Sequence, residues 1–268
     1  MQDTRKRRKS IRDLMKRSFK FDLLLLILAF SLILCSCRQT PSGTGNIPPE
    51  EIGEIRLTAN EDKIAVFSDG YPSGFWARND RGNGHPFNCS FQRSNAVVSD
   101  GLLTLSLTES GGGYVGAEYR TQARFSYGYY SVSMKATSCP GVISSFFTYT
   151  GWPWDEIDIE FLGDDTTRVQ FNYYTSGKGG HEYVYELGFD AAEDFHEYGF
   201  DWQPESITWY VDGVPVYRAT ADIPSTAGHI MMNLWNVADT NADWAGQFDE
   251  SKLPVYAQYQ WIGYKSAG

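Results

Sequence analysis

Three carboxylates recur at every second residue in one short stretch of the chain. Residues 154–161 read Trp-Asp-Glu-Ile-Asp-Ile-Glu-Phe, so acidic and apolar side chains alternate without a break from Glu156 to Phe161. Because successive side chains of a β-strand point to opposite faces, a strand here places Glu156, Asp158 and Glu160 in a row on one face. Neighbouring carboxylates raise one another's pKa, which makes it costly to ionise all three. The row is either the wet face of an ordinary exposed strand or a catalytic group.

Carboxyl groups arranged in this way can hydrolyse a glycosidic bond. The reaction needs one ionised carboxylate to attack or stabilise the sugar cation, and one protonated carboxyl to protonate the leaving oxygen. A middle carboxyl such as Asp158 can hydrogen-bond to a neighbour and separate the two pKa values. The α-carbons of Glu156 and Glu160 lie roughly 13 Å apart on a strand, whereas retaining enzymes hold their carboxyl groups about 5–5.5 Å apart. Retention therefore requires that the two long side chains lean toward each other.

Aromatic residues near the acidic stretch favour a sugar ligand. The C–H faces of pyranose rings stack on indole and phenol rings, so a glucan cleft needs Trp and Tyr beside the acids. Such residues occur on both sides of the stretch: Phe147, Tyr149, Trp152, Trp154, Tyr174, Trp235 and Trp244. Any one of them is more often a core residue than a ligand contact, but their concentration here supports the catalytic interpretation.

Other catalytic motifs are missing from the sequence. It contains no serine nucleophile elbow, phosphate loop, dinucleotide fingerprint or zincin pair. The four histidines are not spaced as metal ligands, and we expect them to pack or to contact substrate: His85, His181, His196 and His229. Any chemistry therefore falls to the carboxylates, and no metal site is predicted.

The elements that must position these residues are strands. With 268 residues, 15% aromatic residues, 26 Gly and 5 Met, the composition favours many short strands joined by glycine turns. Alternating or aromatic-rich runs predict strands at 102–108, 142–149, 167–174, 195–202, 207–211, 214–218 and 255–264. Asp212-Gly213 predicts a two-residue hairpin, and Pro215 marks its second arm as an edge strand or an irregular start. We expect one all-β domain, an antiparallel two-sheet sandwich without internal repeats.

The N-terminus predicts export. A basic segment is followed by an apolar run from Leu23 to Leu34, which is short for a membrane span and typical of a secretory signal. The following Cys35-Ser36-Cys37 resembles a bacterial lipobox, in which Cys37 becomes the lipidated first residue and tethers the protein to a membrane. The alternative is an uncleaved signal anchor, and Met15 is a second candidate start. We therefore expect a secreted bacterial lipoprotein of the cell envelope or cell surface.

The remaining chain divides into a linker and a domain. Residues 38–60 contain scattered Pro and Gly and no sustained apolar period, as in a flexible linker, and residues 61–268 form the expected catalytic domain. The chain carries a net charge of −10, with the acidic excess in the domain. Such a body repels nucleic acid and anionic lipid, so a neutral or cationic ligand is expected. Cys89 and Cys139 lie in the domain, and their separation permits a disulfide without requiring one.

Several long runs closely resemble lichenases, the bacterial endo-β-1,3-1,4-glucanases of glycoside hydrolase family 16. The runs are 154–163 (WDEIDIEFLG), 169–174 (VQFNYY), 179–182 (GGHE), 200–204 (FDWQP), 209–213 (WYVDG) and 230–236 (IMMNLWN). The resemblance covers nearly all of residues 65–265. It implies a β-jelly-roll with a concave substrate cleft, and retaining hydrolysis of mixed-linkage β-glucan by a monomer.

The resemblance also implies a role for each matching residue. Glu156 would be the nucleophile, Glu160 the general acid and then base, and Asp158 the helper that tunes them. Glu118 and Arg120 match a polar sugar-binding pair. Further sugar-contacting positions are matched by Asn83, Phe87, Phe147, Tyr149, Trp154, Asn172, Tyr174, Glu182, Asn233, Trp235 and Trp244.

Departures from the family pattern concern a disulfide, a metal and a loop. Many lichenases pair the counterpart of Cys89 with a cysteine where this chain has Gly116. The family's structural calcium uses an aspartate where this chain has Gln260, which makes calcium doubtful, and no cofactor is required. The loop between Tyr149 and Trp154 is shorter than usual, so the preferred linkage or binding register could differ.

The resemblance implies hydrolysis of β-1,4 bonds next to β-1,3-linked glucose in lichenan and cereal β-glucan. The β-1,3-specific, laminarinase-like members carry an extra residue before the last Glu, which forms a bulge, and this chain lacks it. One alternative is nevertheless a β-1,3-glucanase or a xyloglucan-active relative. Another is a surface lipoprotein that captures glucan without catalysis.

Overall fold

The computed structural model describes residues 63–268. The predicted signal peptide (1–37, with Cys37) and linker (38–60) lie outside the described residues. Sixteen strands make up most of the described chain: β1 (Lys63–Val66), β2 (Phe75–Ala77), β3 (Cys89–Phe91), β4 (Ala96–Ser99), β5 (Leu102–Ser110), β6 (Gly113–Thr121), β7 (Gly128–Lys135), β8 (Val142–Tyr149), β9 (Glu156–Leu162), β10 (Arg168–Tyr174), β11 (Tyr183–Glu186), β12 (His196–Gln203), β13 (Ser206–Val211), β14 (Val214–Ala219), β15 (His229–Asn236) and β16 (Val255–Ser266).

Helical structure in the described chain is confined to short pieces. These are α2 (Ala242–Ala245) and 3₁₀ turns at Phe67–Asp69, Arg93–Asn95, Asp239–Asn241 and Glu250–Lys252. Within residues 63–268, no helix has the length and apolar character needed to cross a membrane.

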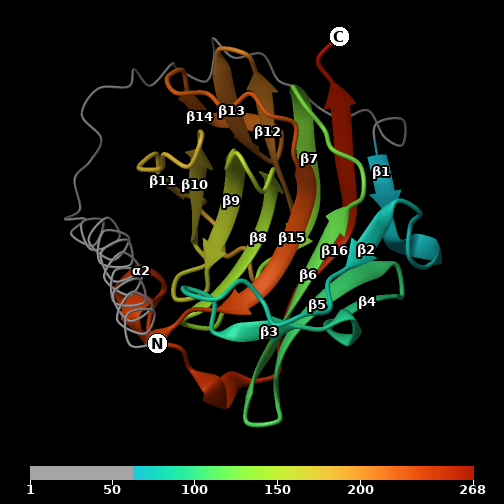
Figure 1. The fold of residues 1–268 in the computed structure, drawn as a ribbon, viewed down its shortest axis with the longest axis vertical. Coiled ribbons are helices and arrows are strands. Elements are labelled where there is room, and N and C mark those ends of the chain that lie inside the picture. Colours follow the sequence, from blue (N-terminus) through green and yellow to red (C-terminus); the bar gives the residue numbers. More distant parts are fainter. Residues whose placement is uncertain (1–62) are drawn as a thin grey trace, which may run out of the picture. The chain divides into compact units, whose positions relative to one another are not determined.

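The strands form two connected sheets, which are antiparallel except that β3 pairs with β6 in parallel. Hydrogen bonds link them in the order β11-β10-β9-β8-β15-β6-β5-β16-β7-β12-β13-β14. β6 pairs with β15 on one side and with β5 on the other, so it joins a first sheet (β11 to β6) to a second sheet (β5 to β14). The strands of the first sheet lie side by side and curve strongly (Figure 1). The prediction of an all-β, antiparallel chain is confirmed.

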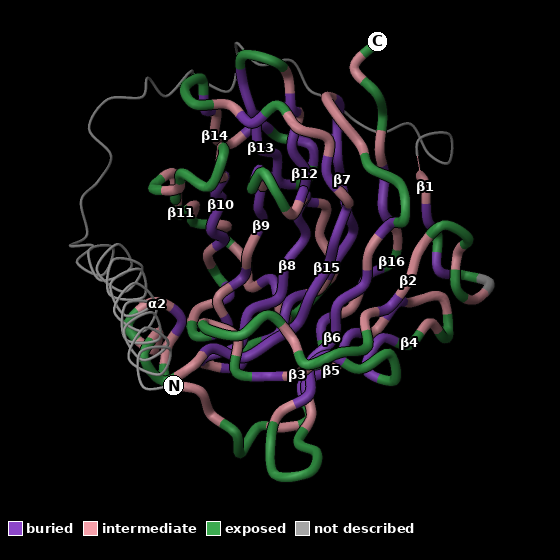
Figure 2. The backbone as a smooth tube through the Cα atoms, in the orientation of Figure 1, coloured by how far each residue is buried: buried purple, intermediate pink, exposed green. Residues whose placement is uncertain are grey.

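Aromatic side chains fill the core between the two sheets. The ring of Phe161 on β9 packs edge-on against Tyr198 on β12, with centroids 4.8 Å apart, and Phe171 on β10 stacks at 5.6 Å on Trp209 of β13. All four rings are fully buried, and buried segments run along both sheets in Figure 2. Fully burying a large apolar side chain contributes roughly 1.5–3 kcal/mol, so the contacts between the sheets hold them in a fixed relation.

β9 acquires its two faces from its sequence. Ile157, Ile159 and Phe161 are buried in the core at 1% exposure or less, while Glu156 and Glu160 on the opposite face keep partial exposure. The indole N–H of Trp209 donates a hydrogen bond of 3.1 Å to the backbone carbonyl of Asp158, which ties the strand to the second sheet. A well-packed apolar side therefore supports the strand that carries the acidic row.

The predicted hairpin is confirmed in detail. Asp212 and Gly213 connect β13 to β14 with φ values of 49° and 77°, and two positive φ values are what a type I′ turn requires. β14 lies at the end of the strand order, and its register with β13 shifts between Trp209 and Tyr210, next to Pro215. The proline therefore occupies an irregular edge strand.

The open question of the two domain cysteines is resolved by their positions. Cys89 and Cys139 are both buried free thiols, and burial raises the pKa of Cys89 to about 11. Gly116 lies beside Cys89: a Cβ on this glycine would come within 3.0 Å of the Cys89 sulfur and within 2.4 Å of the Leu234 carbonyl oxygen. A residue larger than glycine at position 116 would therefore require the neighbouring backbone to move.

Candidate active site

The three carboxylates occupy one face of β9, at the centre of the first sheet. β8 places Tyr149 opposite Glu156 and Phe147 opposite Asp158, and the register runs without a shift on both sides of β9. Residues opposite each other in an antiparallel pair share a face. We call this side of the first sheet the carboxylate face; it is defined by Glu156, Asp158, Glu160 and the residues opposite them on the neighbouring strands.

Glu156 is held by an aromatic pair. The Trp154 indole N–H donates a 2.5 Å hydrogen bond to Oε2 of Glu156. The Trp154 ring stacks on Tyr174 of β10, with centroids 4.5 Å apart and an interplanar angle of 16°. The aromatic pair therefore fixes one carboxylate oxygen of Glu156 by a hydrogen bond that favours the ionised form.

Glu160 is held by a polar relay that sequence reasoning missed. Gln170 of β10, opposite Glu160, donates from Nε2 to Oε2 of Glu160 at 3.0 Å. The Trp244 indole N–H in turn donates to Oε1 of Gln170 at 3.2 Å, which orients the amide. Alternation along the strand could have identified Gln170. It lies two residues before Asn172 and four before Tyr174, and both of these were predicted to contact sugar.

Burial raises the pKa of all three carboxyl groups. Desolvation is the largest cause for each, and the charge of Glu160 further raises the pKa of Glu156. Asp158 is 5% exposed, and a hydrogen bond between its carboxyl and Glu156 raises the pKa of Asp158 while opposing the rise at Glu156. Within this pair, the hydrogen bond therefore favours a protonated Asp158 as the donor and Glu156 as the acceptor.

This electrostatic arrangement predicts a pH-dependent gain in stability for Asp158→Asn. The pKa of Asp158 is higher in the folded chain than the ordinary value of 3.8, so the folded state binds more protons and stability falls as pH rises above 3.8. Asparagine does not ionise, so we expect the Tm difference between Asp158→Asn and the parent to grow from pH 5 to pH 8, by roughly 3–5 °C for each tenfold difference in proton affinity between the folded and unfolded states. Differential scanning calorimetry across this range measures the difference.

A matched control for this measurement is Glu205→Gln, which neutralises an exposed carboxylate between β12 and β13. Comparing the two variants at each pH removes the effect of losing one surface carboxylate. A Tm difference for Asp158→Asn that never exceeds that of the control would contradict the raised pKa of Asp158.

The neighbouring strands bring further predicted residues to the carboxylate face. Asn172 lies opposite Asp158, and its side-chain oxygen accepts from the backbone N–H of Tyr173 at 2.8 Å. On β15, Asn233 lies opposite Ser145 and accepts a hydrogen bond of 2.6 Å from its hydroxyl. These amides extend the polar row across both sides of β9.

An aromatic cluster lies beyond Asn233. Phe87 stacks on Trp235 with ring centroids 3.8 Å apart, and Trp235 lies 6.2 Å from Trp244 at a tilt of 40°. Trp244 also orients Gln170, so the cluster is connected to Glu160. Tyr149 and Phe147 on β8 complete the aromatic residues of this face.

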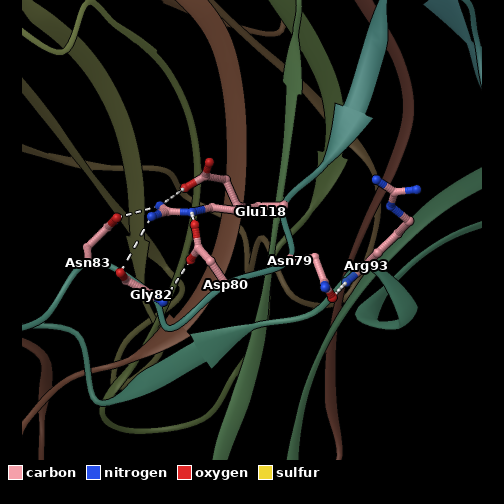
Figure 3. A network of polar contacts seen from close by, with 7 residues as sticks. Asn79, Asp80, Gly82, Asn83, Arg93 and Glu118 are labelled. Atoms are coloured by element: carbon pink, nitrogen blue, oxygen red, sulfur yellow. Dashed lines mark hydrogen bonds and ion pairs between the residues drawn. The ribbon is translucent and has the colours of Figure 1, made fainter.

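A charged group lies at the β6 side of the carboxylate face. Glu118 lies opposite Asn233 and is 2% exposed, and Arg120 lies opposite Met231. The Arg120 guanidinium lies 4.2 Å from the ring centroid of Trp76. Sequence reasoning missed Arg78, which forms an ion pair of 3.0 Å with Glu118 and a hydrogen bond with Asn83 (Figure 3).

Glu182 is the most peripheral of the predicted residues. It is exposed and immediately precedes β11, next to β10. Its charge contributes to the raised pKa values of Asp158 and Glu160, which places it near the row without direct contact. The predicted residues therefore extend over five neighbouring strands from β6 to β10, with Glu182 at the outer side.

Gln260 lies where the resembled family has an aspartate ligand for calcium. The Gln260 side-chain oxygen accepts a hydrogen bond of 2.7 Å from the Ser133 hydroxyl. Over residues 63–268, no three His, Cys, Asp or Glu side chains come together in a metal-binding group. The position thus offers a neutral oxygen that already has a partner in place of a charged ligand.

Comparisons with known proteins agree with this geometry. Residues 83–262 match the model of glycosyl hydrolases family 16. A beta-glucanase of Acetivibrio thermocellus is 48% identical over 229 residues, which cover 83% of this chain and 68% of that protein. The structure of Bacillus licheniformis beta-glucanase matches with a TM-score of 0.72 at 47% identity, over 75% of this chain and 96% of that one.

A third match is the crystal structure of a prokaryotic β-1,3-1,4-glucanase (lichenase) derived from a mouse hindgut metagenome. It is 50% identical, with a TM-score of 0.71, and the match covers 75% of this chain and 97% of that one. The predicted jelly-roll fold is therefore confirmed. This chain belongs to family 16 of the glycosyl hydrolases.

Proposed function

We propose that this enzyme cleaves β-1,4 glucosidic bonds adjacent to β-1,3 linkages within mixed-linkage β-glucan, with retention of configuration. The proposal rests on the row of Glu156, Asp158 and Glu160 on β9, whose register with β8 and β10 has no shift. Trp154 donates a hydrogen bond to Glu156, and Gln170 donates one to Glu160. The two outer carboxyls thus have different partners, as a division between nucleophile and acid requires.

The first half of the reaction uses both outer carboxyls. Ionised Glu156 attacks the anomeric carbon while protonated Glu160 gives its proton to the leaving glycosidic oxygen, so a covalent glycosyl-enzyme forms and the leaving glucan departs. The Trp154 N–H and the Asp158 carboxyl stabilise the charge on Glu156 before the attack. Gln170 keeps the Glu160 carboxyl aimed while it donates its proton.

The second half reverses the roles of the two residues. Glu160, now ionised, takes a proton from a water molecule, and the water oxygen attacks the anomeric carbon and releases Glu156. Two inversions give net retention. Because burial raises the pKa of Glu160, its carboxyl is a suitable proton donor near neutral pH.

An internal position of the cut bond is supported by the extent of the carboxylate face. Five strands from β6 to β10 span about 19 Å at the usual spacing between strands. Predicted sugar-contacting residues occur on both sides of β9, so a glucan chain can extend across the strands past the acidic row. The absence of a bulge in β9 favours the mixed-linkage subgroup over the β-1,3-specific one.

Substrate preference is tested by assaying the chain side by side on lichenan, barley β-glucan, laminarin, xyloglucan and cellulose. We expect rapid release of short oligosaccharides from the first two only, and proton NMR of the first product should show the β-anomer. Preferential cleavage of laminarin or xyloglucan would support the enzyme alternative instead. Binding of glucan without release of reducing sugar would support a non-catalytic capture protein.

We further propose that the enzyme is a monomer tethered to a bacterial envelope membrane through lipidated Cys37. The supporting observations are the basic segment, the apolar run of residues 23–34 and the small residue Ser36 before Cys37. We expect the parent and Cys35→Ser to incorporate a metabolic palmitate analogue and Cys37→Ser to lose this label. A membrane-bound parent that incorporates no label would support an uncleaved signal anchor, and labelled Cys37→Ser would contradict lipidation at Cys37.

A further inference from the structure

Arg78 is the centre of a polar network at the β6 side of the carboxylate face. Its Nη1 lies 3.0 Å from Oε2 of Glu118, and its Nε lies 2.6 Å from Oδ2 of Asp80. Nη1 also donates to the side-chain oxygen of Asn83, and Nη2 donates to the Gly82 carbonyl at 3.4 Å. Figure 3 shows Asn83, Gly82, Asp80 and Glu118 gathered around this one guanidinium.

The ring of Phe91 and two hydrogen bonds from backbone N–H groups hold the network in place. The Arg78 guanidinium lies 5.2 Å from the ring centroid of Phe91. The Arg78 backbone N–H donates to the Glu118 carbonyl at 3.0 Å, and the Gly82 N–H donates to Oδ1 of Asp80 at 2.8 Å. Arginine suits this position because its planar group offers several N–H donors in fixed directions.

One oxygen of Glu118 has no partner within the described chain. Oε2 receives Arg78, whereas Oε1 is buried and lacks a hydrogen bond. A buried carboxylate oxygen without a donor is costly. Glu118 lies opposite Asn233 on the carboxylate face, so the hydroxyl group of a bound sugar is a donor able to satisfy it.

We propose that Arg78 is a positioning residue for glucan binding: it holds Glu118 and Asn83 in place so that their oxygens meet sugar hydroxyls on the β6 side of the acidic row. The inference rests on the proposed function, because it names how one end of the same site is organised. Arg78 follows β2, which pairs with β6, and β6 is itself three strands away from β9, so Arg78 acts through its neighbours. Its loss should therefore weaken binding and leave the chemical step intact.

The test compares Arg78→Gln and Arg78→Lys with Arg93→Gln, which removes an exposed arginine of the same segment. We expect Arg78→Gln to raise KM for barley β-glucan by about 10- to 100-fold with kcat changed by less than about threefold. Arg78→Lys should recover part of the loss, and Arg93→Gln should match the parent. Circular dichroism and Tm verify that each variant is folded.

A pH profile separates positioning from a general structural role. Burial raises the pKa of Glu118, and Arg78 opposes the rise. In Arg78→Gln, Glu118 should therefore take up a proton at higher pH, and KM should rise as pH falls through that range. The Arg78→Gln/Glu118→Gln double variant should lose this dependence on pH.

The inference and the proposed function fail in different ways. If the parent cleaves barley β-glucan and Arg78→Gln keeps the parental KM, the positioning role is wrong while the function stands. If the parent does not cleave it, calorimetric titration of the Glu156→Ala and Glu156→Ala/Arg78→Gln variants with barley glucan oligosaccharides still measures the contribution of Arg78 to binding. Equal affinities in that titration would overturn the inference.

A second and independent observation concerns Trp152. Its side chain is 91% exposed, the largest value among the large apolar residues of the described chain. The loop that carries it joins Tyr149 to Glu156, which lie opposite each other on the carboxylate face. Trp154 is only two residues from Trp152; it donates a hydrogen bond to Glu156 and stacks on Tyr174.

The loop holds Trp152 in place through its two ends. Thr150 bonds from its hydroxyl to the Pro153 carbonyl and accepts at 2.9 Å from the Asp155 N–H. The Asp155 carboxylate accepts from the backbone N–H groups of Ser176, Ser225 and Thr226 at 2.7–3.1 Å. An exposed indole on a fixed loop loses little freedom when a ligand covers it.

We infer that Trp152 forms an additional sugar-stacking position at the rim of the carboxylate face, beyond the Trp154–Tyr174 pair. The ligand chemistry is the C–H face of a pyranose ring, because the loop is continuous with the proposed glucan site and the domain has an acidic excess that disfavours anionic lipid. This inference also rests on the proposed function.

The test uses Trp152→Ala with Tyr256→Ala as control, since Tyr256 is a half-exposed aromatic residue on β16 of the second sheet. We expect Trp152→Ala to raise KM for barley β-glucan about three- to tenfold and Tyr256→Ala to have no effect. In the Glu156→Ala background, barley glucan should protect an iodide-accessible tryptophan signal that Trp152→Phe lacks. Full iodide access in the presence of saturating barley glucan would overturn this inference without affecting the proposed function.

Discussion

Glu156→Ala is expected to lower kcat/KM on barley β-glucan by about four orders of magnitude or more, with the fold intact. Loss of the proposed nucleophile removes the covalent step of the proposed mechanism, and the remaining groups would only bind the substrate and protonate the leaving oxygen. Stability should not suffer, because burial raises the pKa of Glu156 and makes its ionised form costly in the folded state. The Tm of the variant should therefore equal or exceed that of the parent at pH 7.

Azide distinguishes loss of the nucleophile from general damage. With an activated aryl β-glycoside, the azide anion can enter the space left by the Glu156 side chain and attack the anomeric carbon directly. One inversion gives the α-glycosyl azide, with the aryl alcohol as leaving group. A variant whose activity azide does not restore, although it is folded and binds substrate, would show that Glu156 is not the nucleophile. Glu205→Gln serves as the surface control.

Glu160→Ala is expected to have the second largest effect, with a different signature. General acid catalysis contributes about 10²- to 10⁴-fold, so hydrolysis of glucan, whose leaving group is poor, should fall by that factor. Substrates with a good leaving group do not need the proton and should still form the glycosyl-enzyme on Glu156. Azide then attacks that intermediate, and the second inversion gives the β-glycosyl azide.

The opposite azide products make the two assignments separately testable. Gln170→Leu offers a graded comparison for Glu160, because it removes the 3.0 Å hydrogen bond to Glu160 while leaving the carboxyl in place. The variant should move the alkaline limb of the pH profile of kcat/KM to higher pH, because the lost hydrogen bond lowers the pKa of Glu160 in the parent. An α-glycosyl azide from Glu160→Ala would exchange the roles of the two residues.

The strand that carries the acids could be predicted from the sequence because apolar and acidic residues both recur there at every second position. In a strand, this spacing buries Ile157, Ile159 and Phe161 on one face. It places Glu156 and Asp158 on the opposite face. The Asp212-Gly213 turn could be predicted for a similarly local reason, since two positive φ values are most accessible to this pair. Local chemistry determines such features, and long matching runs extended them to the family.

Functional residues that no local sequence pattern marks could not be predicted from the sequence. Gln170 reads as an ordinary polar strand residue until β10 is placed in register with Glu160. Arg78 lies in a loop-rich segment, 40 residues before Glu118, and only the pairing of β2 with β6 brings the two together. The state of Cys89 and Cys139 was equally open, because sequence separation does not fix the distance between two sulfur atoms.

The sequence by itself determined the all-β architecture, the family and the row of three carboxylates on one strand, because these depend on alternation, turns and contiguous runs. Only the tertiary structure decided which partners distinguish the carboxyls: Trp154 for Glu156, Gln170 for Glu160 and Arg78 for Glu118. Burial and hydrogen bonding set the pKa of a carboxyl, and both depend on how the strands pair and pack. Residues 156–160 alone specify the acidic row, whereas the partner of Glu160 depends on the pairing of β9 with β10, and the partner of Glu118 depends on the pairing of β2 with β6.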